Sequence, residues 1–233
     1  MLLAIDTSAG TSVAVVDRDG GVLAEATEFD TRRHAEVVGE LIAACLDESG
    51  IAPHGLSAVV AGMGPGPFTG LRVGIAAARA FAFGAGKPCL PLVSHDAIAF
   101  ERLGGLAVAT GSADAAPATT GTATPLLVVT DARRREVYWS AYGGLDEAGL
   151  PVRIGAPALT RPAELDEAVS SSCGADFAEA ATRTDPAATT VSAGALGMLG
   201  ETLFANRRPF AADEPLYLRS PDVTVPGAPK RVS

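Results

Sequence analysis

A short polar turn near the N-terminus carries the first residues that could do chemistry. Asp6 ends an apolar run, and Thr7 and Ser8 follow it among other small polar residues. Such a turn can hold a metal–phosphate group, because the carboxylate binds through a cation or water while turn amides point at phosphate oxygens. Alternatively, the Asp and Thr side chains satisfy only their own backbone. The sequence leaves both interpretations open.

The glycine- and proline-rich stretch at 64–72, which reads GPGPFTGLR, is the most specific motif of the chain. Its glycines allow close backbone approach, whereas Pro65 and Pro67 stiffen the loop. The stretch runs into the N-terminus of a predicted helix, which favours an anion. It is not a Walker loop, because no lysine follows the last glycine.

Small residues at steps of four follow in the same predicted helix. This stripe could pack on the chain's own sheet, or it could let a helix of a partner protein approach closely. The apolar face of the preceding helix would lie beside it. The candidate residues of a partner interface are Val37, Leu41, Ile42, Cys45, Gly70, Gly74, Ala78 and Ala82.

The cysteines and histidines predict no metal centre. The three cysteines have no close partner, so neither a disulfide framework nor a CxxC site is indicated. No two histidines share a helix at metal-ligand spacing, and the fourth residue after His95 is Ala99.

The charge of the chain argues against direct nucleic-acid binding. The net charge is −9 at pH 7, whereas phosphate contacts need lysine and arginine side chains. The basic cluster is the run of three arginines at 133–135. It is either a solvated turn between strands or a contact for a phosphate or an acidic partner.

The composition is that of a folded protein with a sizeable core. Of the 233 residues, 48% are hydrophobic and 19% are charged. No apolar run reaches the ~18 residues of a membrane span, and no charged leader precedes one. We therefore expect a soluble, cytoplasmic protein without membrane contact.

The first half of the chain has the βββ-α-β-α-β-α order of an RNase H-like half domain. We expect residues 1–104 to form this N-terminal lobe and to carry the partner-binding surface. Its predicted elements are strands at 2–5, 13–16 and 22–27, a helix at 31–49, a strand at 56–62, a helix at 69–83, a strand at 89–93 and a helix at 94–103.

The second half begins again with strands and predicts a smaller lobe over 125–220. Residues 105–124 are rich in Ala and Thr without periodicity, which indicates a flexible linker or loop, and residues 221–233 are expected to be a disordered tail. The elements predicted in the smaller lobe are strands at 126–130, 137–142 and 152–154 and helices at 162–169 and 192–206.

Four stretches in the same order resemble the TsaB (YeaZ) family, which takes part in making threonylcarbamoyladenosine in bacterial tRNA. They lie at 5–8, 64–74, 131–138 and 215–219. The resemblance is most specific over the N-terminal lobe. The usual family loop has serine where this chain has Pro67, which stiffens the loop and removes a hydroxyl.

The resemblance implies an actin-like, Hsp70-type ATPase (RNase H-like) α/β fold of two lobes, the second one reduced. It implies a non-catalytic scaffold or activator, a shortened relative of the TsaD transferase, that pairs with TsaD through its first two helices. A TsaE-type ATPase would be a third partner, and tRNA would bind only through the complex. The free chain would form a homodimer.

The same resemblance implies that no cofactor is bound tightly by this chain and that ATP and metal reside in the partner subunits. TsaD places a metal with an HxxxH pair, of which only His95 has a counterpart here. The alternative function is an actin-fold enzyme active on its own, either a kinase or a metal-dependent transferase or peptidase. That enzyme needs a second phosphate loop, and the candidate at 172–176 has a single glycine.

Overall fold

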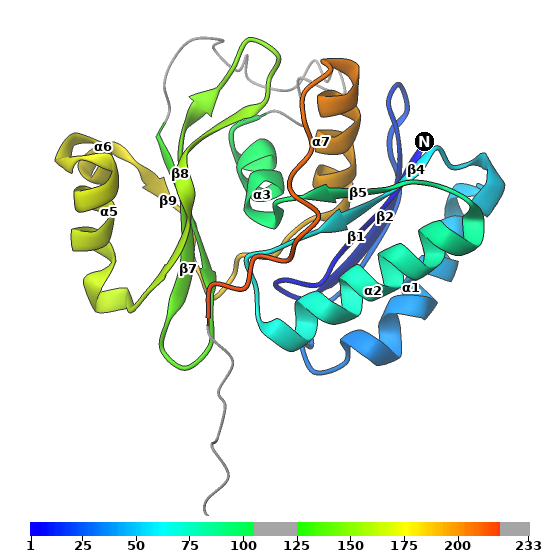
Figure 1. The fold of residues 1–233 in the computed structure, drawn as a ribbon, viewed down its shortest axis with the longest axis horizontal. Helices are drawn as coiled ribbons and strands as arrows, with labels where there is room; N and C mark the ends of the chain where they lie inside the picture. The colour runs from blue at the N-terminus through cyan, green and yellow to red at the C-terminus, as the bar shows by residue number, and fades with distance from the viewer. Residues whose placement is uncertain (105–124, 220–233) are drawn as a thin grey trace, which may run out of the picture.

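The computed structural model describes residues 1–104 and 125–219, which build an α/β fold around two mixed β-sheets (Figure 1). The predicted linker at 105–124 and the predicted tail at 221–233 lie outside the described residues. None of the described helices combines the length and the apolarity that crossing a membrane requires.

The first sheet has five strands in the order β3-β2-β1-β4-β5. β1 pairs antiparallel with β2 and parallel with β4. Every residue of β1 and β4 is buried, and both strands read as apolar runs up to the polar Asp6 that ends β1. The strands are β1 (Leu2–Asp6), β2 (Thr11–Asp17), β3 (Gly21–Glu28), β4 (Ala58–Gly62) and β5 (Cys89–Leu92).

Helices cover both faces of this sheet (Figure 1). α1 (His34–Ser49) and α2 (Phe68–Ala85) lie side by side on one face and share a buried cluster with β1, β2 and β4. α3 (Ser94–Arg102) and α7 (Ala193–Ala205) pack on the other face. A short 3-10 turn, η1 (Pro53–Gly55), precedes β4.

The position of α7 corrects the predicted lobe boundary. The helix forms where the apolar pattern predicts it, but it packs on the first sheet rather than in the smaller lobe. Its glycines permit this contact, since a Cβ on Gly197 would lie 2.8 Å from a methyl of Val16. The chain thus returns to the first sheet after completing the second.

The second sheet has four strands in the order β8-β7-β6-β9 and carries helices on its outer face (Figure 1). The three predicted strands are confirmed and run longer than expected, whereas α6 and β9 were not predicted. The elements are β6 (Leu126–Asp131), β7 (Val137–Leu145), β8 (Pro151–Thr160), η2 (Pro162–Glu164), α5 (Leu165–Cys173), α6 (Ala175–Ala180) and β9 (Thr182–Arg183).

Buried polar contacts of α3 join the two sheets. His95 is 1% exposed, and its Nδ1 and Nε2 lie 2.8 Å from Ser140 Oγ and 2.9 Å from Thr130 Oγ1. The neighbouring Asp96 accepts a hydrogen bond of 2.7 Å from the Tyr142 hydroxyl. These side chains fix the junction between the sheets.

The enclosed His95 makes stability depend on pH. Burial lowers the pKa of His95 to about 3. At pH values between this folded pKa and the unfolded pKa of about 6.5, the unfolded chain binds one more proton than the folded chain. His95 therefore lowers the free energy of unfolding by about 1.4 kcal/mol for each unit by which the pH falls. We expect urea titrations of His95→Gln to show a shallower decline of stability than the wild type below pH ~6. Equal slopes for the two proteins would contradict this account.

Candidate functional site

The Asp6 carboxylate is enclosed by donors of its own chain. Asp6 is 1% exposed. Its Oδ1 accepts from the Ser8 N–H at 2.8 Å and the Ser8 hydroxyl at 2.6 Å, and its Oδ2 accepts from the Ser94 hydroxyl at 2.5 Å. Burial raises the pKa of Asp6 in spite of these bonds. The described contacts of this carboxylate are therefore those of a satisfied turn.

The glycine-rich loop and the start of α2 close over the same turn. Thr7 Oγ1 donates to the Gly70 carbonyl at 2.7 Å and accepts from the Gly74 N–H at 3.1 Å. A Cβ on Gly74 would lie 2.2 Å from Thr7 Oγ1, and one on Gly62 would lie 1.8 Å from Asp6 Oδ2. These glycines are required by packing within the chain. Ser8 lines two cavities, and both of them reach Arg133 of the β6–β7 turn.

The structure corrects the residues predicted for a partner surface. All but one are buried, and the half-buried Leu41 packs on the same cluster beneath α1 and α2. Their side chains meet the first sheet, so the stripe packs on the chain's own sheet. The corrected residues are Val37, Leu41, Ile42, Cys45, Gly70, Gly74, Ala78 and Ala82.

The outer sides of the same two helices carry a different set of small residues. We call this set the α1–α2 face: Ala35, Gly39 and Ala43 of α1 with Ala76, Ala80 and Gly84 of α2. All of them are exposed. A Cβ on Gly39 or Gly84 would meet nothing within 4 Å, and the adjoining Phe83 is 90% exposed.

Sequence reasoning missed the α1–α2 face although the signal was present. Both the buried and the exposed sets repeat at steps of four, so spacing alone does not tell which stripe meets the sheet. On α2 the exposed run begins at Ala76, two positions after Gly74 of the buried run. Two residues turn an α-helix by about 200°, so the two runs lie on opposite sides of the helix.

The second sheet holds the His95 ring at both of its nitrogens. Both ring nitrogens contact hydroxyls of the second sheet, which leaves neither for a metal. Across residues 1–104 and 125–219, no group of three metal-ligating side chains comes together.

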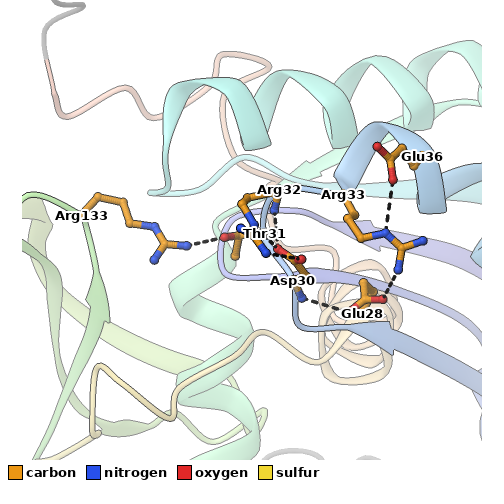
Figure 2. A network of polar contacts seen from close by, with 7 residues as sticks. All are labelled: Glu28, Asp30, Thr31, Arg32, Arg33, Glu36 and Arg133. Carbon is orange, nitrogen blue, oxygen red and sulfur yellow. Dashed lines mark hydrogen bonds and ion pairs between the residues drawn. The ribbon is translucent and has the colours of Figure 1, made fainter.

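Basic side chains meet where the loop before α1 approaches the second sheet (Figure 2). Arg133 of the β6–β7 turn donates to the Thr31 hydroxyl across the two lobes. The Arg32 guanidinium makes two side-chain hydrogen bonds of 3.0 Å to Asp30. The arginines are thus fixed by neighbouring groups.

A C-terminal segment, residues 210–219, also bridges the lobes, and we call it the strap (Figure 1). The Leu216 N–H donates to the Met63 carbonyl at 2.8 Å, and the Tyr217 ring lies 4.7 Å from that of Phe68. Arg219 then pairs with Glu136 beside the β6–β7 turn. The strap therefore touches the glycine-rich loop, α2 and the second sheet in succession.

Comparisons with known proteins agree with this architecture. Residues 5–167 match the family model of TsaD, tRNA N6-adenosine threonylcarbamoyltransferase. An uncharacterized protein of Mycobacterium tuberculosis is 34% identical over 224 residues, which are 95% of this chain and 92% of that protein. The Escherichia coli tRNA threonylcarbamoyladenosine biosynthesis protein TsaB is 33% identical over 149 residues, which are 64% of this chain and 57% of that protein.

Solved structures from Pseudomonas aeruginosa share the fold. One, an uncharacterized protein with similarity to peptidase YEAZ, has a TM-score of 0.69 and 26% identity, covering 94% of this chain and 99% of its own. Another, YeaZ, has a TM-score of 0.66 and 24% identity with the same coverage. On the family model, the relatives and the fold together, the chain belongs to the TsaB (YeaZ) family of TsaD-related proteins.

Proposed function

We propose that this protein is a non-catalytic scaffold and activator in tRNA threonylcarbamoyladenosine formation, and that it pairs with a TsaD-type transferase. The observation that carries the proposal is the α1–α2 face. It is exposed, and it is made of residues too small to keep another helix at a distance. Curated relatives named TsaB and tRNA N6-adenosine threonylcarbamoyltransferase supply the class of partner.

The strand order supports an actin-like, RNase H-like ancestry for both lobes. In the first sheet, three antiparallel strands are followed by parallel strands in the order 3-2-1-4-5. The second sheet repeats the order 3-2-1-4 with the same strand directions and without a fifth strand. This arrangement is that of a duplicated unit whose second copy is reduced.

Two sets of contacts support a non-catalytic role. Asp6 is enclosed by serine hydroxyls, and His95 is enclosed by the second sheet. Catalysis would require these groups to face a substrate. In this proposal the ATP and metal of the pathway reside in partner subunits, and this chain binds no cofactor tightly.

The partners follow from the same face and from the charge. A TsaD-type subunit covers the α1–α2 face in the complex, and a second copy of this chain covers it when TsaD is absent. A TsaE-type ATPase docks on the assembled pair. With a net charge of −9, the chain contacts tRNA only through the complex.

Light scattering after size exclusion tests the pairing directly. An equimolar mixture of this chain with its cognate TsaD is expected to elute as one species whose mass equals the sum of the two chains. Separate elution of the two proteins at micromolar concentration would contradict the proposal.

A further inference from the structure

The two lobes, one built on each sheet, share a hydrophobic core along one side. A single buried cluster combines Phe100 of α3 and Leu196 of α7 with Leu126, Val128 and Tyr142 of the second sheet. The polar contacts of α3 described above lie at the same junction. The lobes are therefore packed firmly against each other at α3.

On the side of the β6–β7 turn, by contrast, the lobes face each other across cavities. A cavity of about 430 Å³ is lined by residues 66–69 of the first lobe and by Ala132, Arg133 and Tyr138 of the second. Two smaller cavities lie between Ser8 and Arg133. Atoms that line a cavity lack packing partners on one side. The angle between the lobes therefore depends, on this side, on individual polar contacts.

The middle of the strap is fixed to the first lobe. Its backbone and its tyrosine ring contact the Met63 carbonyl and the Phe68 ring, as described above. The Arg72 guanidinium lies 4.9 Å from the centre of the same Phe68 ring. Further upstream, the Asp213 carboxylate accepts a hydrogen bond of 2.7 Å from Arg79 of α2. This part of the strap thus follows α2 and the glycine-rich loop.

The end of the strap is fixed to the second lobe through one side chain. The Arg219 guanidinium donates to the Ala132 carbonyl at 3.2 Å and to the Arg133 carbonyl at 3.4 Å, and it pairs with Glu136. The planar fork of an arginine suits several acceptors at once. Arg219 and Glu136 are only 27% and 28% exposed, so salt screens this pair less than a surface pair.

The turn that Arg219 contacts has a strained backbone. Arg133, Arg134 and Arg135 all have left-handed φ values, of 62°, 52° and 62°. Residues other than glycine rarely adopt this conformation, and it persists only where the surroundings support it. Arg219 supplies such support at two carbonyls of the turn, and Arg133 in its turn donates to the Thr31 hydroxyl of the first lobe.

We propose that the strap holds the second lobe closed against the first, with Arg219 as its positioning residue. Arg219 secures two links between the lobes: the strap itself, and the Arg133–Thr31 contact that depends on the shape of the turn. Without Arg219 the turn loses its support, and the lobes move apart on this side while the core at α3 keeps them together. This property goes beyond the scaffold function and does not depend on it.

Double electron–electron resonance of the full chain measures the separation of the lobes. Ala76→Cys on α2 and Ala163→Cys place one spin label on each lobe, because both positions are exposed. Ala163 follows β8, whose end pairs with the start of β7 next to the turn. Cys89→Ser and Cys173→Ser remove the half-buried native thiols. Burial raises the pKa of the remaining Cys45 to about 11, so this thiol stays unlabelled.

We expect a single narrow distance in this labelled protein. Arg219→Gln should add a second, longer distance that accounts for about 10% of the molecules or more. Glu136→Gln weakens the same ion pair from its other side and should also add the longer distance. Neither variant changes a residue of the shared core, so both should keep the wild-type circular dichroism spectrum.

Arg208→Gln is the matched control. Arg208 pairs with Asp146 of the β7–β8 hairpin, away from the β6–β7 turn, and its side chain is 52% exposed. Such an exposed pair contributes little, so this variant should keep the single distance. One unchanged distance in both Arg219→Gln and Glu136→Gln, or equal opening in Arg208→Gln, would overturn the proposal. The measurement contains no TsaD, so failure of the scaffold function would leave its result unaffected.

Discussion

Replacing Gly74 with alanine will lower the free energy of unfolding by about 3 kcal/mol or more. The new methyl group would lie 2.2 Å from Thr7 Oγ1 and 2.9 Å from the Thr7 methyl. Thr7 cannot retreat without losing its hydrogen bonds to the Gly70 carbonyl and the Gly74 N–H. The free-energy cost of overpacking and the cost of two broken buried hydrogen bonds therefore add together. Urea denaturation monitored by circular dichroism measures the difference.

Gly39→Ala is the matched control for this substitution. Gly39 is also helical, but a Cβ there would meet nothing within 4 Å. Alanine should therefore raise the free energy of unfolding by about 0.5–1 kcal/mol through its better helix propensity. If Gly74→Ala unfolded at the same urea concentration as wild type, the close contact of α2 with the turn would be wrong.

Ala80→Arg will weaken association with the cognate TsaD by about 100-fold or more. Ala80 is exposed at the centre of its row on the α1–α2 face, between Ala76 and Gly84. The axes of two helices in contact lie about 8–10 Å apart. An arginine at position 80 places a long charged side chain in this space, where there is room only for small residues. Isothermal titration calorimetry of the two purified proteins measures the change.

The same substitution on the second lobe provides the control. Ala180 is exposed at the end of α6, which covers the outer face of the second sheet. Both arginine variants should keep the wild-type unfolding free energy within about 0.5 kcal/mol, because neither site is buried. Full TsaD affinity in Ala80→Arg would remove the α1–α2 face from the interface.

Local patterns predicted most of the elements because their signals lie in neighbouring residues. Continuous apolar runs predicted β1 and β4, since both strands are buried on both faces. Gly50 and Gly86 end α1 and α2 in left-handed conformations, so those helix ends were also encoded locally. The placement of α7 depends on its contact with the distant Val16, and no local pattern encodes it.

The candidate sites depended still more on contacts between distant residues. The sequence identified the turn at Asp6 but not the Ser94 hydroxyl that encloses it from 88 positions away. It identified the arginines of the β6–β7 turn but not the strap that holds them through Arg219.

Formation of threonylcarbamoyladenosine in tRNA is the most direct test of the central claim. The reaction contains cognate TsaD, TsaE, threonylcarbamoyl-adenylate and tRNA, with and without this chain. We expect modified tRNA only when both TsaD and this chain are present, with activity lost in Ala80→Arg and kept in Ala180→Arg. Undiminished activity without this chain would contradict its role as the activating subunit.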